Sequence, residues 1–166
     1  RISMHDAVAE ILAADNIPAL SEQDIINAAR DELGVIGNYD KSLQSLFKRK
    51  VGATLQKPTF ITDLPRSLTP MAKGAEDNNA IVKKVMFYAR GIQMGDGCYE
   101  ENDPHIQLDN FTKQYQRQIK DGFPQYPRDA DFMSAIERAI PPMSGIAIGY
   151  DRMIMMVTGA QHIKEV

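Results

Sequence analysis

The stretch SGIAIGYDRMIMMVTG, residues 144–159, places an arginine where a strand pattern changes into a helix pattern. Ile146 and Ile148 alternate with small residues as in a strand, and apolar residues at helical spacing begin at Met153. Arg152 would therefore lie in the first turn of a helix. A guanidinium beside the exposed backbone N–H groups of a helix start is suited to binding a phosphate.

Two glycines flank the Arg152 junction on its strand side. Gly145 and Gly149 allow another backbone or a flat ligand to come close. The alternative interpretation is that Asp151 is the N-cap of the helix and that Arg152 is a solvated surface residue. Apolar residues on all sides of the helix indicate that most of it is buried, which argues against an idle arginine at its start.

A second group of candidate residues lies in the acidic stretch GDGCYEENDP, residues 95–104. On an extended strand Glu100 and Asn102 share one face, whereas Glu101 points to the other. A carboxylate beside an amide is suited to binding an ammonium group, and Asp96 lies nearby on the same stretch. The alternative interpretation is a solvated acidic edge of a hairpin.

The composition argues against several other classes of protein. The 166-residue chain has 25% charged residues, 43% apolar residues and a net charge of -3, which is typical of a soluble globular protein. This charge offers no strong electrostatic case for binding nucleic acid or a membrane surface. A single cysteine, Cys98, rules out an internal disulfide and fits a reducing compartment. We find no membrane-spanning run, no signal peptide and no histidine pattern typical of a metal site, and we expect a cytoplasmic protein.

The elements that must position these residues form an α+β pattern, with helices first and a mixed sheet after them. Capping signals, a Ser followed three residues later by an Asp, predict two helices near the N-terminus, and Gly34 ends the second. The pair Arg90–Gly91 predicts a turn between two strands, with a Gly-rich turn after the second strand. Helices are predicted from residue 3, over 21–34, 39–55, 104–122 and 128–142, and after 149; strands are predicted over 57–65, on both sides of residue 90, at 98–104 and before 149.

Three stretches, taken in order and spacing, resemble the C-terminal half of a class II lysyl-tRNA synthetase catalytic domain. They are KPTFITDLPRSLTPMAK, RGIQMGDGCYEENDP and PPMSGIAIGYDRMIMMVTG, and the last is similar to motif 3 of the class. The resemblance covers nearly the whole chain and weakens only in the first 50 residues. It implies part of an antiparallel sheet flanked by helices, with a helical segment at 1–55 and the sheet, further helices and motif 3 at 56–166.

The resemblance also implies roles for the candidate residues. Arg152 stands at the position of the motif 3 arginine, which contacts the terminal phosphate of ATP. Gly145 and Gly149 match glycines that line the adenine and ribose site. Glu100 matches the carboxylate that pairs with the lysine ε-ammonium, and Asn102 lies beside it in an adjoining family position.

Several positions depart from the family pattern. Met86 and Gln93 stand where the family has two carboxylates that hold Mg²⁺ on the ATP phosphates, and neither side chain is a good Mg²⁺ ligand. Asp96 replaces a family asparagine near the substrate, where its charge would repel a substrate carboxylate. No segment resembles motif 1, the dimer strand, or motif 2, whose arginine holds the α-phosphate. We therefore expect a C-terminal portion of the catalytic domain that is inactive by itself.

The resemblance implies ATP-dependent activation of lysine and its transfer to tRNA. In this family the lysine carboxylate attacks the α-phosphate of ATP, and the acyl group then passes to the tRNA 3′ end. The implied partners are lysine, ATP, Mg²⁺ and tRNA, in a homodimeric parent protein. One alternative is a protein-lysine ligase, which the segment GFPQYP at 122–127 resembles somewhat more. Another is a non-catalytic paralogue that acts as a binding or regulatory module, which Met86 and Gln93 favour.

Overall fold

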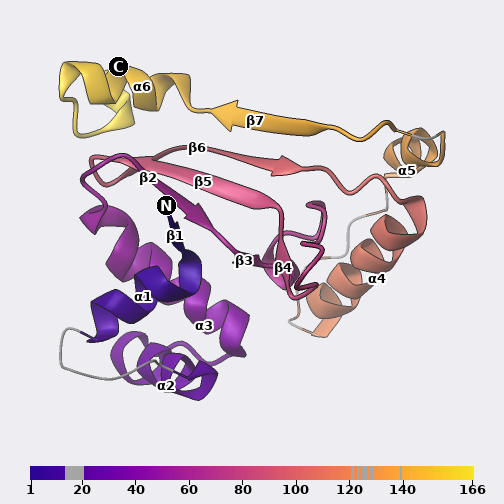
Figure 1. The fold of residues 1–166 in the computed structure, drawn as a ribbon, viewed down its shortest axis with the longest axis horizontal. Coiled ribbons are helices and arrows are strands. Elements are labelled where there is room, and N and C mark those ends of the chain that lie inside the picture. The colour runs from indigo at the N-terminus through magenta and orange to yellow at the C-terminus, as the bar shows by residue number, and fades with distance from the viewer. Residues whose placement is uncertain (14–20, 121, 123, 125–126, 128, 139) are drawn as a thin grey trace.

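The structure is a computed structural model that describes residues 1–13, 21–120, 122, 124, 127, 129–138 and 140–166. A five-stranded sheet runs through the described part of the chain, in the order β1-β2-β5-β6-β7, with helices at both ends of it (Figure 1). All neighbouring strands are antiparallel except β1 and β2, which are parallel. The predicted α+β class is confirmed. The strands of this sheet are β1 (Ile2–Ser3), β2 (Thr59–Thr62), β5 (Lys84–Ala89), β6 (Ile92–Tyr99) and β7 (Ser144–Ile148).

Three helices near the N-terminus pack under one face of the sheet (Figure 1). They are α1 (Met4–Leu12), α2 (Glu22–Leu33) and α3 (Tyr39–Leu46), and α3 continues as a π-helical turn, η2 (Phe47–Val51), and a 3₁₀ turn, η3 (Gly52–Thr54). Their apolar residues and those of the sheet form the main core. Its fully buried members include Val8, Ile25, Leu43, Leu46, Phe47, Val51 and Ile61.

Local signals account for the starts of these helices. The Ser3 side chain accepts a hydrogen bond from the backbone N–H of Asp6 at 2.9 Å, and Ser21 and Asp24 form a reciprocal capping box. Gly34 ends α2 in the left-handed conformation, with φ 65°. The predicted caps are confirmed. They could be predicted from the sequence because each depends on residues within one turn of the chain.

Ser3→Ala is expected to lower the free energy of unfolding by about 1 kcal/mol, the usual effect of removing an N-cap oxygen. Urea unfolding should show a lower midpoint with an unchanged slope. Ser45→Ala is a matched control, because the Ser45 hydroxyl donates to the carbonyl of Lys41 inside α3 and caps no helix start. An equal loss of stability in both variants would contradict the capping role.

The remaining elements lie at the other end of the sheet and along its last edge. A small second sheet pairs β3 (Leu64–Pro65) with β4 (Ile81–Val82), and a 3₁₀ turn, η4 (Arg66–Leu68), follows β3. Beyond it come α4 (Pro104–Lys120) and α5 (Ala130–Glu137), and β7 leads into α6 (Tyr150–Thr158) and a final 3₁₀ turn, η5 (Ile163–Glu165). Among the described residues, no helix has the length and apolar character needed to cross a bilayer.

The strand register assigns side chains to two faces of the sheet, because directly paired residues lie on the same side. We call one the helix-side face, since its member Ile61 is completely buried against the helices. Its register rows are Ile61–Met86–Asp96–Ala147 and Lys84–Cys98–Gly145. The opposite, outer face carries Phe60, Val85, Phe87, Ile146 and Ile148.

The hairpin predicted at Arg90–Gly91 is confirmed, but the Gly-rich turn predicted after it is wrong. Arg90 and Gly91 both have positive φ, 51° and 74°, as a tight two-residue hairpin requires. Gly95 and Gly97 lie inside β6, close to the backbone of β7. A Cβ on Gly95 would come within 2.4 Å of the carbonyl oxygen of Ala147, so this strand pair needs glycine there.

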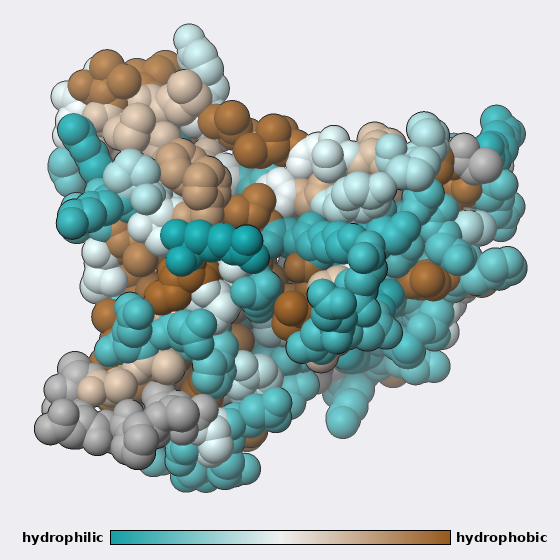
Figure 2. Space-filling model, in the orientation of Figure 1, coloured by the Kyte–Doolittle hydropathy of each residue, from teal (hydrophilic) through white to brown (hydrophobic). Residues whose placement is uncertain are grey.

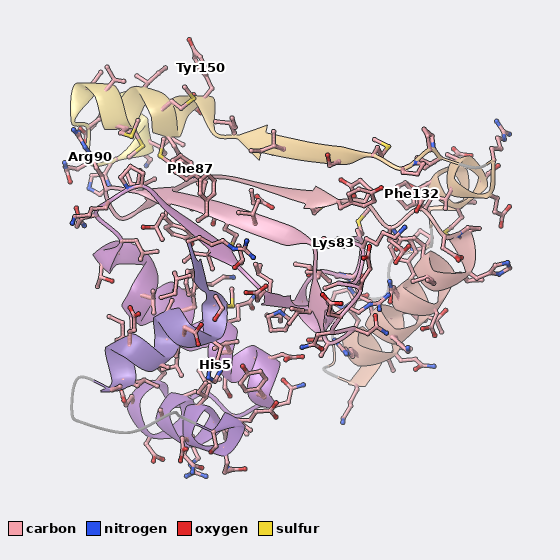
Figure 3. The ribbon with its side chains drawn as sticks, viewed as in Figure 1. His5, Lys83, Phe87, Arg90, Phe132 and Tyr150 are labelled. Carbon is pink, nitrogen blue, oxygen red and sulfur yellow. The ribbon has the colours of Figure 1, made fainter. Side chains whose placement is uncertain are left out.

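The expectation that α6 is buried on most sides is also wrong. Met155 is its buried residue, whereas Val157 is 82% exposed and Met153 is exposed as well. Figure 2 shows apolar side chains gathered on the surface around α6 and the adjoining end of β7. Tyr150 points away from the rest of the molecule (Figure 3). The described residues therefore leave part of the apolar surface of α6 uncovered.

Candidate functional site

Glu100 lies where β6 ends and projects over the helix-side face. Its backbone forms an isolated bridge with Ala72, and its N–H donates to the carbonyl of Met143 at 3.0 Å. The Cys98 thiol lies 3.3 Å from the Glu100 carboxylate, which therefore leans back along the strand. A Cβ at Gly145 would meet only this carboxylate within 4 Å, at 3.7 Å. Glu100 thus borders open space on the side of β7.

Cys98 is protonated and supports Glu100 as a hydrogen-bond donor. Burial, and then the hydrogen bond to Glu100, raise the pKa of the Cys98 thiol to about 11. A thiol with this pKa stays neutral near pH 7 and is a poor nucleophile. Its contribution at this site is therefore to orient the Glu100 carboxylate.

The raised pKa of Cys98 gives the stability a pH dependence at alkaline pH. An unfolded thiol loses its proton near pH 9, whereas the folded one keeps it to about pH 11. The unfolded state thus binds fewer protons between these values, and the free energy of unfolding should fall as pH rises. Urea unfolding at a series of pH values gives the free energy of unfolding of wild type and of Cys98→Ala, and the difference between the two should change with pH. A difference that stays constant from pH 9 to 11 would contradict it.

The chain leaves the strand direction after Glu100, so the predicted sharing of a face by Glu100 and Asn102 fails. β6 ends at Tyr99, and Asn102 lies in the connection to α4. The Asn102 amide is held on both sides: its oxygen accepts from the Lys73 ammonium at 3.0 Å, and its nitrogen donates to the carbonyl of Ile140 at 3.3 Å. Asn102 is therefore a fixed part of this wall of the site.

Glu101, predicted to point to the face opposite Glu100, is buried with only 4% exposure, so the alternative of a solvated acidic edge does not hold for this residue. The Arg66 guanidinium lies 3.6 Å from one carboxylate oxygen of Glu101. The other carboxylate oxygen of Glu101 accepts a hydrogen bond from the backbone N–H of Asp103 at 3.3 Å. Asp103 in turn accepts from the N–H groups of His105 and Ile106, which starts α4 as predicted. This ion pair, in which Glu101 is buried and Arg66 partly exposed, anchors the segment immediately after Glu100.

Arg152 lies at the other end of β6. Its guanidinium donates to the backbone carbonyl of Gln93 at 2.7 Å and remains exposed to solvent. The N-cap of α6 is Gly149, which offers no side-chain cap, so the alternative in which Asp151 caps the helix is wrong. The first N–H groups of α6 and the remaining donors of Arg152 thus stay available to an anion. The side chain of Arg90 also secures α6, by donating to the carbonyl of Met156 at 2.9 Å (Figure 3).

Asp96 occupies the helix-side face between these two ends and is already paired. The Lys84 ammonium lies 2.6 Å from the Asp96 carboxylate, and both side chains are partly buried. The sequence indicated a bare negative charge that would repel a substrate carboxylate. The structure changes this picture, because a neighbouring cation offsets the charge of Asp96.

Neither of the two positions that carry metal ligands in the resembled family fits Mg²⁺ here. Met86 packs against the main core, and a thioether does not replace a charged oxygen. The side-chain oxygen of Gln93 lies 3.4 Å from the Tyr88 hydroxyl. Within the part of the chain that the structure describes, no three His, Cys, Asp or Glu residues gather as metal ligands would.

A separate open cavity of about 640 Å³ lies between η4 and α4. It is lined by none of the candidate residues. Its cations are engaged locally, since Lys113 pairs with Asp109 at 2.5 Å and Arg117 donates to the carbonyl of Ser67 at 3.1 Å. This cavity is therefore not the site described above.

The structure thus places four of the residues singled out from the sequence on the helix-side face: Met86, Asp96, Glu100 and Gly145. Gln93 lies near the start of β6, at the end away from Glu100, and Arg152 binds its backbone there. Glu100 and Arg152 are separated by most of the length of β6, about 20 Å at the usual rise per residue. Sequence reasoning missed three supporting residues, Lys73, Lys84 and Cys98. The alternation of Cys98 with Glu100 along a strand was a usable signal for one of them.

Comparison with known proteins shows what the chain is similar to. A family model described as tRNA synthetases class II (D, K and N) matches residues 1–166. The chain is 34% identical to a lysine–tRNA ligase of Saccharolobus solfataricus over 171 residues, covering 100% of this chain and 34% of the relative. A lysine–tRNA ligase of Sinorhizobium medicae is 30% identical over 169 residues, with the same two coverages. The chain spans about a third of the length of these curated relatives.

Proposed function

Because the chain belongs to the class II tRNA synthetases of the D, K and N family, we propose that it supplies the lysine- and ATP-binding half of a lysine-activating site. The relatives named lysine–tRNA ligase support the choice of amino acid. The observation that carries the proposal is the placement of a carboxylate, Glu100, and a guanidinium, Arg152, at opposite ends of one strand.

In this proposal Glu100 binds the ε-ammonium of lysine. An ammonium group leaving water needs a charged partner, and the Cys98 thiol keeps the carboxylate oriented for it. Arg152 and the N-terminus of α6 bind the terminal phosphate of ATP. Gly145 leaves room for the adenine and ribose, whereas a side chain at Gly149 would come within 3.0 Å of the Arg152 side chain, so glycine there lets Arg152 keep its position. The lysine carboxylate then attacks the α-phosphate between these ends, with pyrophosphate as the leaving group, and catalysis is mainly positioning.

The proposal extends to the whole protein that contains this chain. Residues 1–166 form one portion of its catalytic domain, tRNA is the acceptor of the lysyl group, and the protein acts as a cytoplasmic homodimer. The protein-lysine alternative rests on residues 122–127, half of which lie outside the described residues. It therefore gains no structural support.

Lysine-dependent exchange of radiolabelled pyrophosphate into ATP tests the proposal in the whole protein. Exchange should occur with lysine and be at background with aspartate and asparagine, the other two amino acids of the family. Transfer of labelled lysine to tRNA then identifies the acceptor. Exchange that depends on a different amino acid would contradict the assignment of Glu100.

A second candidate function is a paralogue that binds lysine and ATP without activating the amino acid. The specific observation in its favour is the replacement of both metal-position carboxylates by Met86 and Gln93. Lysine and ATP binding without any pyrophosphate exchange would identify this function.

Restoring glutamate at both positions should make ATP binding depend more strongly on Mg²⁺. Calorimetric titration of ATP into Met86→Glu/Gln93→Glu, with and without Mg²⁺, measures the change. Met86→Gln is the matched control, because it adds a polar side chain at the same place without a charge. Wild-type ATP binding that already depends strongly on Mg²⁺ would show that other residues hold the metal.

A further inference from the structure

The part of the structure that has no role so far is the open cavity of about 640 Å³ between η4 and α4. It adjoins a second cavity of about 440 Å³, which lies between residues 36–41, η4 and the last turns of α4. Both cavities are lined by Asp40, Ser67, Leu68 and Arg117, so they form one elongated groove. We call it the α4 groove. It lies at the end of the sheet away from α6 (Figure 1).

One wall of the α4 groove is a single face of α4. The residues of this helix that line the groove recur at intervals of three and four, which places them on one side of the helix. Three of them are basic: Lys113, Arg117 and Lys120. They follow one another over about 10 Å of the helix axis at the usual helical rise. This wall therefore presents a row of positive charges.

The rest of the lining does not cancel this row of charges. Lys41 and Arg66 add two positive charges, whereas the acidic residues that line the groove are Asp40 and Asp109. Five basic residues thus line the groove against two acidic ones, although the whole chain has a net charge of -3. Such a local excess of positive charge favours an anionic ligand.

Several of these cations can still bind a ligand. The Arg117 guanidinium donates to the carbonyl of Ser67 at 3.1 Å, which holds the side chain in place and leaves most of its N–H donors for a ligand. Lys41 and Lys120 are exposed and form no ion pair with another described residue. Lys113 pairs with an exposed carboxylate four residues before it, and a pair between exposed side chains adds little stability. An incoming carboxylate therefore displaces no buried partner of these three lysines.

The uncharged lining indicates which kind of anion fits. Leu68, Pro70 and Ala80 line the groove, and so does Ile36, which is 84% exposed. Among the described residues that line the groove none is aromatic, so the bases of a single-stranded nucleic acid would find no ring on which to stack. Aliphatic side chains of a peptide would instead bury apolar surface against this lining. The lining therefore favours an acidic peptide over RNA or DNA.

The spacing of the cations fits an extended peptide. Alternate side chains of an extended chain lie on the same side, about 7 Å apart, and the side chains between them point the other way. Lys113 and Arg117 are separated by about 6 Å along the axis of α4. Acidic side chains at alternate positions can therefore reach successive cations of α4, while the side chains between them point toward the opposite wall at Leu68.

We infer that the α4 groove is a docking site for an extended segment of a partner protein in which acidic residues alternate with aliphatic ones. Lys113, Arg117 and Lys120 bind the carboxylates, and Leu68 and Ile36 contact the aliphatic side chains. The groove is separate from the proposed lysine and ATP site, because no candidate residue of that site lines it. Docking and lysine activation can therefore be tested independently.

Fluorescence anisotropy of a labelled short peptide of alternating glutamate and valine, titrated with the whole protein, tests this inference. The same peptide with glutamine in place of glutamate is the control for charge. The acidic peptide should bind saturably, less tightly as the salt concentration rises, and at least about tenfold more tightly than the glutamine peptide. Arg117→Gln should weaken binding of the acidic peptide about tenfold and leave lysine-dependent pyrophosphate exchange unchanged.

Three other variants separate docking from a general effect of charge. Lys120→Glu reverses an exposed charge and should also weaken binding of the acidic peptide. Ile36→Ser should weaken it through the loss of an aliphatic contact, with little effect on folding at so exposed a position. Lys48→Gln is the matched control, because Lys48 is exposed on η2 and lines neither cavity, and it should leave binding unchanged.

Three results would overturn the inference. The first is equal binding, or no binding, of the acidic and glutamine peptides. The second is a Lys120→Glu variant that binds the acidic peptide as tightly as wild type does. The third is a labelled single-stranded RNA that binds wild type but not Lys120→Glu, while the acidic peptide does not bind, since this would assign the groove to nucleic acid.

Discussion

Replacing Glu100 by glutamine should weaken lysine binding by at least about 100-fold, because removing one partner of a desolvated charge pair leaves the other charge uncompensated. Glutamine has nearly the same shape, and the neighbouring Cys98 thiol still finds an oxygen acceptor. ATP binding should therefore stay close to the wild-type value. Calorimetric titration of lysine and of ATP into the whole protein measures both quantities on one variant.

Glu76→Gln provides the matched control for this substitution. Glu76 is well exposed and pairs with Lys83 at 2.7 Å, so the same chemical change at the surface should have little effect on lysine binding. If lysine binds equally well to wild type and to Glu100→Gln, the carboxylate has no part in recognising the substrate.

Arg152→Gln should weaken ATP binding by about 10- to 100-fold, which corresponds to about 1.5–3 kcal/mol for hydrogen bonds to a charged group. The side chain is exposed and makes one hydrogen bond to the carbonyl of Gln93, so folding should change little. AMP, which lacks the terminal phosphates, should bind both proteins alike. This difference between ATP and AMP assigns the effect to the phosphate contact.

Arg30→Gln is the control for the loss of a surface guanidinium, since Arg30 pairs with the exposed Asp31 on α2. It should leave ATP binding unchanged. If Arg152→Gln binds ATP as tightly as wild type does, the alternative interpretation holds, in which Arg152 is a solvated surface residue.

The parts of the fold that depend on short stretches of chain were predictable from the sequence. The caps at Ser3 and Ser21 use residues within one helical turn, and the hairpin at Arg90–Gly91 uses two positions with positive φ. The strand-to-helix change before Arg152 was equally local. In each case the physical cause is a backbone hydrogen bond or a steric preference of neighbouring residues.

The parts that depend on register or on the end of a strand were not predictable. The burial of Glu101 depends on where the chain leaves the strand direction, which it does after Glu100. The pairing of Lys84 with Asp96 depends on which residues of β5 and β6 face each other. The exposed side of α6 was missed for a different reason, since an apolar pattern indicates a tendency to be covered and does not identify what covers it.

The most direct test of the proposed site is the titration of a non-hydrolysable lysyl-adenylate analogue into the whole protein. This ligand joins both halves of the site in one molecule, since its lysyl end reaches Glu100 and its adenylate end lies beside Gly149. Saturable binding tighter than that of lysine alone, lost on Glu100→Gln, is the expected result. Equal binding of the analogues that carry lysine and aspartate, or no binding of the lysyl analogue, would contradict a lysine-activating site at this face of the sheet.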